Sequence, residues 1–134
     1  MPDRAALETA LDAIRRGRVD ELVDYVDPAF EGVVPADMSA EPDTYAGPEG
    51  VRRYFELFEE TVDDLRFEPQ LADDIDDWIL VEIHITGRGR SSGLPVDAVV
   101  VSAVLMRGQK LLRMEGFRTL DEARAALAER AERR

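Results

Sequence analysis

The sequence contains no cysteine, which excludes disulfide bonds, thiolate metal sites and a cysteine nucleophile. It has a single histidine, His84, and a single lysine, Lys110. No apolar run approaches the ~18 residues of a membrane-spanning helix. The first ten residues also lack the basic start and apolar core of a signal peptide. We therefore expect a cytoplasmic protein that does not span a membrane.

Positive charge is scarce as well. Seventeen lysines and arginines face 29 aspartates and glutamates, so the formal net charge is −12. A nucleic-acid partner requires Lys and Arg side chains that neutralise phosphates, and an acidic protein is repelled by anionic membranes. The composition therefore argues against both classes of partner.

The length of 134 residues fits one domain, since domains run to about 100–200 residues. We expect a single domain over residues 1–134. Thr119 with Glu122 three residues later forms a capping-box pattern, which predicts the start of a final helix. The charged tail at 128–134 is expected to fray.

The first quarter of the chain has the pattern of two helices. Leu7, Leu11 and Ile14 recur at helical spacing, and Gly17 is a plausible stop. Asp20 is a candidate cap for a second, short helix. Helical segments here would present one apolar face to a core.

Irregular sequence follows before a longer helix. Asp27-Pro28 ends the second helix, because the residue before proline resists the helical region, and Phe30–Val34 is a candidate short strand. Pro35–Gly47 is rich in turn formers and predicts a long loop. Pro48 suits the first turn of a helix. The apolar stripe of that helix consists of Val51, Tyr54, Phe55, Phe58 and Val62.

The second half has the pattern of an antiparallel meander. Leu65–Leu71 alternates apolar and polar residues, and Pro69 restricts it to an edge or bulged strand. Three longer apolar runs follow, joined by short glycine-bearing connections: Trp78–Thr86, Val96–Met106 and Lys110–Arg118. Helices followed by such a meander predict an α+β fold.

The faces of these strands predict a partner. In Trp78–Thr86 one face is wholly apolar, while the other turns from apolar to polar along its length. Val96–Met106 is apolar on both faces, so it needs cover on both sides of the sheet. Helices can cover one side. We expect a second copy of the chain to cover the other, giving a homodimer through the sheet.

This order of elements resembles the nuclear-transport-factor-2-like superfamily, and most closely its SnoaL-like, polyketide cyclase-like branch. The likeness covers nearly the whole chain. It is carried by Tyr45–Val51, Ile85–Gly93, Gly108–Leu111 and Asp121–Ala123. The resemblance implies a cone-shaped α+β fold, a curved antiparallel sheet wrapped round the N-terminal helices, with an apolar pocket at its open end.

The resemblance does not imply one reaction, because the superfamily includes isomerases, cyclases, dehydratases, epoxide hydrolases and non-catalytic modules. Steroid-isomerase-like members place a carboxylate base where this chain has Val33. Cyclase-like members often place a histidine at the position nearest Ser102. Both departures count against those chemistries.

The candidate catalytic residues are His84, Arg113 and Glu115. His84 is a possible base with Glu82 on the same strand face, although residues two apart on a strand lie too far apart for a direct bond. Arg113 and Glu115 share a face of the last strand, as an anion clamp and a carboxylate. The alternatives are a half-buried or interface histidine and a solvated ion pair.

A second group of side chains is expected to line the pocket. Plain core packing is the alternative for the two of them on the long helix, Tyr54 and Phe58. The group consists of Tyr45, Tyr54, Phe58, Trp78, Ser102 and Phe117.

We expect no metal and no cofactor. The acidic turn Asp73–Asp77 lacks the glycine and distal glutamate of a calcium loop, and Gly87–Gly93 lacks the lysine of a phosphate loop. The sequence thus predicts a protein that binds a small apolar or aromatic molecule. The alternative is an isomerase, cyclase or hydratase that uses acid–base residues in its pocket.

Overall fold

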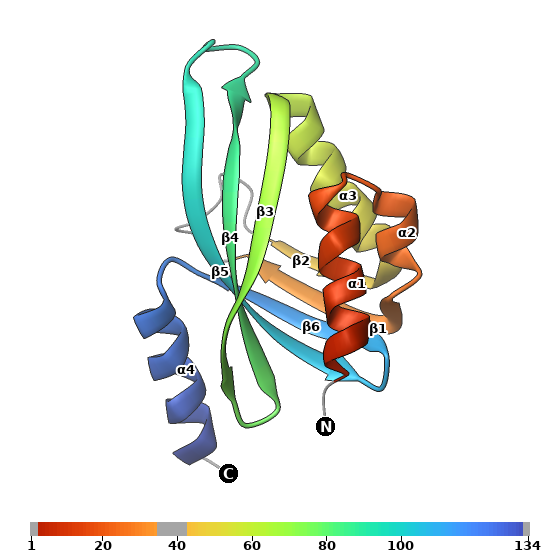
Figure 1. Cartoon of the computed structure of the whole chain (residues 1–134), viewed down its shortest axis with the longest axis vertical. Coiled ribbons are helices and arrows are strands. Elements are labelled where there is room, and N and C mark those ends of the chain that lie inside the picture. The colour runs from red at the N-terminus through yellow and green to blue at the C-terminus, as the bar shows by residue number, and fades with distance from the viewer. Residues whose placement is uncertain (1–2, 35–42, 133–134) are drawn as a thin grey trace.

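The computed structural model describes residues 3–34 and 43–132. Helices α1–α3 pack on one side of a curved six-stranded sheet, and α4 packs on the other (Figure 1). The elements are α1 (Arg4–Arg15), α2 (Val19–Val23), β1 (Val26–Val34), β2 (Asp43–Ala46), α3 (Gly47–Thr61), β3 (Val62–Ile75), β4 (Trp78–Gly89), β5 (Pro95–Arg107), β6 (Lys110–Phe117) and α4 (Leu120–Glu132). The predicted α+β class is confirmed.

The two N-terminal helices form where the spacing predicts them. Asp3 caps α1, since its carboxylate accepts a hydrogen bond from the Ala6 N–H at 3.0 Å. After α1 ends, Gly17 takes a left-handed φ of +69°. One detail differs: α2 begins after Arg18, so Asp20 lies in its first turn and favours it through the helix dipole instead of capping it.

The sheet runs in the order β2-β1-β6-β5-β4-β3, and β1–β6 is its one parallel pair among the described strands. β3 is an edge strand, as Pro69 requires. β1 starts at Val26, earlier than the expected Phe30, because Val26 already pairs with Leu111 of β6; the register between the two strands then shifts before Glu31. Within the expected loop, Asp43–Ala46 forms strand β2 and Gly47 begins α3, while 35–42 lies outside the described residues.

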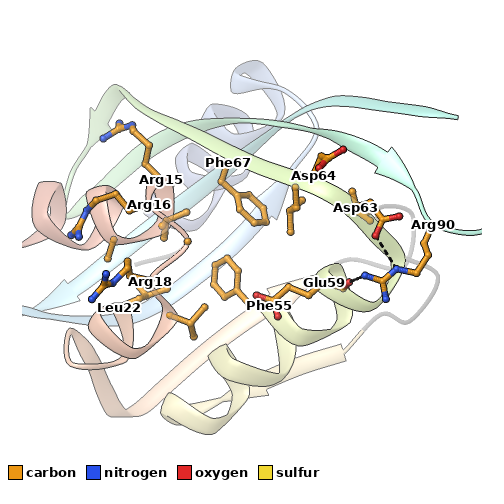
Figure 2. A pocket seen from close by; sticks show the side chains of 16 residues that line it. Arg15, Arg16, Arg18, Leu22, Phe55, Glu59, Asp63, Asp64, Phe67 and Arg90 are labelled. Carbon is orange, nitrogen blue, oxygen red and sulfur yellow. Dashed lines mark hydrogen bonds and ion pairs between the residues drawn. The ribbon is translucent and has the colours of Figure 1, made fainter. Parts of the chain in front are cut away.

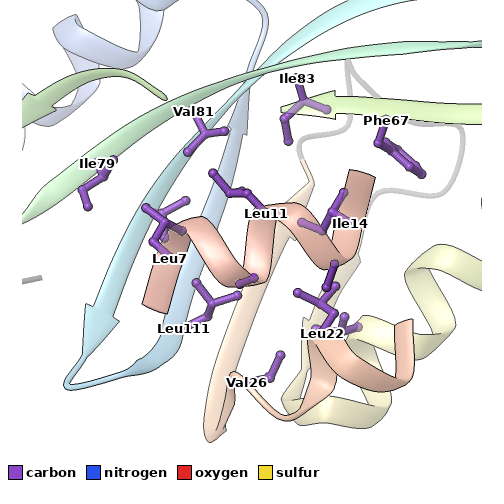
Figure 3. Packing of buried hydrophobic residues seen from close by; sticks show 14 of the residues in the cluster. Leu7, Leu11, Ile14, Leu22, Val26, Phe67, Ile79, Val81, Ile83 and Leu111 are labelled. Atoms are coloured by element: carbon purple, nitrogen blue, oxygen red, sulfur yellow. The ribbon is translucent and has the colours of Figure 1, made fainter. Parts of the chain in front are cut away.

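The inner face of the sheet carries the main core (Figure 3). Strand register aligns Ile79 with Val104 and Val81 with Ser102, so alternate residues of β4 and β5 face the helices together. Leu7 and Leu11 of α1 pack onto this face, and both side chains are buried. The core therefore lies between the sheet and α1–α3.

The outer face of the sheet is partly covered by α4. The buried residues of this second cluster are Trp78, Leu80, Val101, Ala103, Ala123 and Leu127. The expected cover on the second face of β5 is thus supplied over Val101 and Ala103 by the chain's own last helix, which continues to Glu132 through most of the segment expected to fray. Thr119 accepts a hydrogen bond from the Glu122 N–H at 3.1 Å, as the capping-box pattern predicts.

Candidate functional site

An apolar cavity of about 160 Å³ lies inside the fold, between α3, strands β1 and β2, and the inner face of the sheet. Val33 and Val34 close it on the β1 side, and Val100, Ser102 and Met114 come from β5 and β6. Strand alternation points the side chains of Val100, Ser102 and Met114 inward, so the sheet forms the floor of the cavity.

Five aromatic side chains form one wall of this cavity: Tyr45, Tyr54, Phe55, Phe58 and Phe67. All their contacts are edge-to-face, with ring centroids 5.1 to 5.6 Å apart. Tyr54 contacts Phe55 and Phe58, and both of these contact Phe67, so four rings close a cycle. Such contacts favour a defined arrangement beyond simple burial.

Close packing against β2 holds this wall in place. A Cβ atom built on Gly50 of α3 would lie 2.6 Å from the carbonyl carbon of Tyr45. Only glycine lets the helix approach β2 so closely. The approach brings the rings of Tyr45 and Tyr54 to a centroid distance of 5.3 Å.

The polar groups of the cavity are hydroxyls. Burial, with a smaller contribution from Tyr45, raises the pKa of Tyr54 to about 12. Like other tyrosines it is protonated at neutral pH, where its hydroxyl is a hydrogen-bond donor. Tyr45 and Ser102 add two further hydroxyl groups. Among the described residues that line the cavity there is no carboxylate, histidine, lysine or arginine.

Four of the six expected pocket residues line this cavity: Tyr45, Tyr54, Phe58 and Ser102. Trp78 and Phe117 lie elsewhere, packed with α4 on the outer face of the sheet. Register explains the difference, because Ser102 pairs with Gly116, which places the adjacent Phe117 on the opposite face.

His84 also lies on the outer face and points away from the cavity residues. Its Nε2 lies 2.6 Å from Oδ1 of Asp97 on β5, and its side chain is 46% exposed. The partner of His84 is thus Asp97 on the neighbouring strand and not the expected Glu82. Paired strands bring side chains closer together than positions two apart on one strand. His84 is not among the residues that line the cavity.

Arg113 and Glu115 do pair, at 3.1 Å, but also on the outer face. Arg130 of α4 donates to the same Glu115 carboxylate, and Arg113 reaches Glu31 at 3.1 Å. Burial alone would raise the pKa of Glu115, but the hydrogen bonds from Arg130 and Arg113 outweigh it and hold this pKa below its usual value. The pair therefore ties α4 to the sheet and lies outside the cavity.

A second, open cleft of about 370 Å³ lies between α1 and α2, the C-terminal half of α3 and the start of β3 (Figure 2). Its rim carries charged side chains, including Arg16, Arg18 and Asp64. Sequence reasoning missed it, because its walls come from segments that only the fold brings together. Within the described residues no group of three His, Asp or Glu side chains is arranged to hold a metal ion.

Comparison with known proteins identifies the family. Residues 7–114 match the family model for the SnoaL-like domain. The chain belongs to the SnoaL-like domain family. No curated protein matches its sequence. None of the helices in the described part of this SnoaL-like domain is long and apolar enough to cross a membrane.

Solved structures agree with that assignment. An NTF2-like protein from Burkholderia thailandensis E264 has a TM-score of 0.75 at 20% identity, over 84% of this chain and 87% of that chain. TerC, co-crystallised with polyporic acid, has a TM-score of 0.74 at 18% identity, over 93% and 97%. A cystatin-fold protein from Novosphingobium aromaticivorans has a TM-score of 0.69 at 21% identity, over 88% and 99%. At these identities the likeness shows the fold.

Two residues of this SnoaL-like domain stand at positions where related enzymes would carry catalytic groups. Val33 and Ser102, where the resemblance would put an isomerase base and a cyclase histidine, both line the cavity. The position of Ser102 therefore offers the cavity a hydroxyl in place of an imidazole, and Val33 borders the cavity from β1 with no carboxylate.

Proposed function

We propose that this SnoaL-like domain binds a small aromatic molecule in the cavity between α3 and the sheet. The observation that carries the proposal is the wall of five aromatic side chains in an apolar cavity that a sixth aromatic residue, Phe30, also lines. Apolar cavities of this kind are the usual place for small ligands in a fold. An aromatic guest can continue the edge-to-face contacts that the wall already makes.

The volume favours a ligand body about the size of one ring. The cavity measures about 160 Å³, close to an apolar cavity of about 150 Å³ that stays dry and binds benzene. Pockets that bury drug-sized ligands are larger, roughly 300–1,000 Å³. A single six-membered ring with one or two substituents therefore suits this space.

The hydroxyl groups favour a ligand that carries an oxygen. Tyr54, with its pKa of about 12, is a donor, and Ser102 lies on the sheet side of the cavity. A phenol or an aryl carbonyl would offer these hydroxyls a partner, whereas a plain hydrocarbon would not. The complex of the structurally similar TerC with polyporic acid supports a ligand that carries an oxygen.

Acid–base catalysis of the isomerase, cyclase or hydratase type has less support. It needs a group at the ligand that exchanges a proton near the working pH. The described lining offers hydroxyl groups only, and His84, Arg113 and Glu115 are on the other face of the sheet. Binding without turnover is therefore the function we propose.

The proposal is tested by calorimetric titration of the protein with p-cresol, a one-ring phenol. We expect saturable one-to-one binding, and weaker binding of 4-methylcyclohexanol, which keeps the hydroxyl but lacks the ring. Ser102→Leu, which fills the cavity from β5, should weaken p-cresol binding about tenfold or more, equivalent to about 1.4 kcal/mol. Val99→Leu, on the exposed face of the same strand, should not.

If p-cresol gives no saturable heat with the wild-type protein, or if Ser102→Leu and Val99→Leu bind it equally well, the cavity is not the site.

We also propose that two copies pair through the outer face of the sheet beside α4. The support is the apolar surface that α4 leaves uncovered at the β4–β5 hairpin. Val99 is 49% exposed and Leu94 66% exposed, which is unusual for large apolar side chains within the described part of the chain.

A further inference from the structure

The open cleft and the inner cavity share a partition. Ile14 and Leu22, from the first two helices, line both spaces, and so do Phe55 of α3 and Phe67 of β3. These four side chains lie between a cleft of about 370 Å³ and a mainly apolar cavity of about 160 Å³. Movement of those side chains would join the two.

Phe55 and Phe67 form the aromatic part of this partition. Their ring centroids lie 5.3 Å apart at an interplanar angle of 79°. Figure 2 shows the two rings pointing toward each other across the cleft, one from the helix and one from the strand. The rings come from different elements, so a change in the spacing of α3 and β3 would separate them.

Arg90, in the turn between β4 and β5, ties the last turn of α3 to the first residues of β3, which follow it directly in the chain at the far end of the cleft. Its Nε lies 3.0 Å from Oδ1 of Asp63 on β3, and its Nη2 donates to the Glu59 carbonyl of α3 at 2.7 Å. The Arg90 side chain is 54% exposed and that of Asp63 49%. The backbone N–H of Arg90 also donates to the Thr61 carbonyl at 2.9 Å. An exposed ion pair is weak, so the side-chain part of the tie is the part that can open.

We propose that ligands reach the inner cavity through this cleft, by passing between Phe55 and Phe67, and that this pair limits how long a ligand can be. This inference rests on the proposed function. With the pair closed, the cavity holds one ring. With the pair apart, cavity and cleft together come within the usual range for ligand pockets, roughly 300–1,000 Å³, and hold an aromatic molecule whose polar end lies among the charged side chains of the cleft.

Two matched substitutions on α3 separate this route from a general enlargement of the cavity. Phe55 and Phe58 both line the cavity and both contact Tyr54 and Phe67, but only Phe55 also lines the cleft. Phe55→Ala opens the partition, whereas Phe58→Ala enlarges the cavity behind it. Phe55→Leu opens the partition less and retains apolar bulk. It replaces Phe55→Ala in the experiment if the alanine variant folds poorly.

The probe is 2-naphthol, a fluorescent two-ring phenol, followed by stopped-flow fluorescence, with p-cresol affinity measured in parallel. Phe55→Ala or Phe55→Leu should raise the association rate of 2-naphthol about tenfold, a barrier change of about 1.4 kcal/mol. Phe58→Ala should change its dissociation constant while the association rate stays within about twofold of wild type.

A second pair of variants tests the tie without altering the cavity. Arg90→Ala should raise the association rate of 2-naphthol several-fold. Arg88→Ala, on the adjacent strand, should leave it unchanged, because the Arg88 guanidinium bonds only the Gly93 carbonyl among the described residues and lines neither space.

Equal association rates in the Phe55 and Phe58 variants, with p-cresol still bound, would overturn the route and place entry elsewhere. An unchanged rate in Arg90→Ala would overturn the role of the tie. Absence of p-cresol binding by the wild-type protein would instead overturn the proposed function. Failure of the entry route and failure of the proposed function are therefore distinguishable.

Discussion

Tyr54 is a residue whose surroundings change its acid–base behaviour, since its pKa is raised to about 12. It stands at the meeting point of three aromatic contacts and lines the cavity. Its phenol resists ionisation because burial penalises the charged form, with Tyr45 nearby adding to the effect. A donor hydroxyl that stays protonated is what an oxygen-bearing aromatic ligand requires.

The pKa of about 12 for Tyr54 predicts a loss of stability at high pH. Between pH ~10, where an unfolded tyrosine ionises, and pH 12, the unfolded chain binds fewer protons than the folded one. The free energy of unfolding should therefore fall as pH rises through this window, by up to about 1.4 kcal/mol per pH unit.

Denaturant unfolding at a series of pH values measures this loss, and absorbance of tyrosinate measures the titration itself. Tyr54→Phe should remove both the late titration phase and its share of the pH dependence. A late phase that persists in Tyr54→Phe would show that another group is responsible.

For single residues, the sequence predicted which side chains are apolar or charged better than it predicted which face of the sheet they occupy. The alternation of β4 and β6 separated two faces correctly, but it did not tell which face lines a cavity. Trp78, Phe117 and Glu115 were therefore expected in a pocket that lies on the other side of the sheet. That assignment depends on register between β5 and β6, which pairs Ser102 with Gly116 and leaves no local signal in either strand.

Helix α4 is the element whose role was least visible in the sequence. Its apolar face is thin, consisting mainly of Ala123 and Leu127, yet both are buried against the outer face of the sheet. Arg130 strengthens the attachment through Glu115, and its guanidinium lies 5.8 Å from the centre of the Trp78 ring. The apolar second face of β5 correctly predicted cover, but a two-faced pattern does not say whether a helix or another subunit supplies it.

Leu127→Ala should loosen α4, because removing a fully buried leucine side chain costs about 2–5 kcal/mol. Trp78 is the one tryptophan and is 7% exposed beneath this helix. We expect its fluorescence to shift to the red and to become more accessible to acrylamide. Affinity for p-cresol should not change, because the cavity lies on the other side of the sheet.

Ala125→Ser, at an exposed position of α4, serves as the matched control and should leave the Trp78 emission unchanged. If Leu127→Ala abolished p-cresol binding while leaving Trp78 protected, α4 would have a role that its position on the outer face does not explain.

In the whole molecule, the two faces of the sheet differ in what they carry. The inner face, with α1–α3, forms the core and the cavity, and the outer face carries α4 and an uncovered apolar region at the β4–β5 hairpin. The order of helices and meander made this architecture predictable from the sequence. The cleft was not, because Arg16, Phe55 and Arg90 are far apart in the chain and become neighbours only in the fold.

The proposed pairing of two copies predicts a solution mass twice the 15.0 kDa of one chain at micromolar concentration. Val99→Glu should shift the equilibrium to monomers, because it places a charge in the apolar part of the interface. Ala5→Glu adds the same charge on the exposed side of α1 and should leave the mass unchanged. Analytical ultracentrifugation measures both, and a wild-type monomer at this concentration would contradict the pairing.

The central claim, that the inner cavity is a binding site for an aromatic ligand, is tested most directly by methionine-methyl NMR during titration with p-cresol. Met114 lines the cavity, whereas Met106 packs against the same core without lining it. Met114→Leu and Met106→Leu assign the two signals. We expect a saturable ring-current shift of the Met114 methyl with little change at Met106. Saturable binding that moves Met106 and leaves Met114 in place would contradict it.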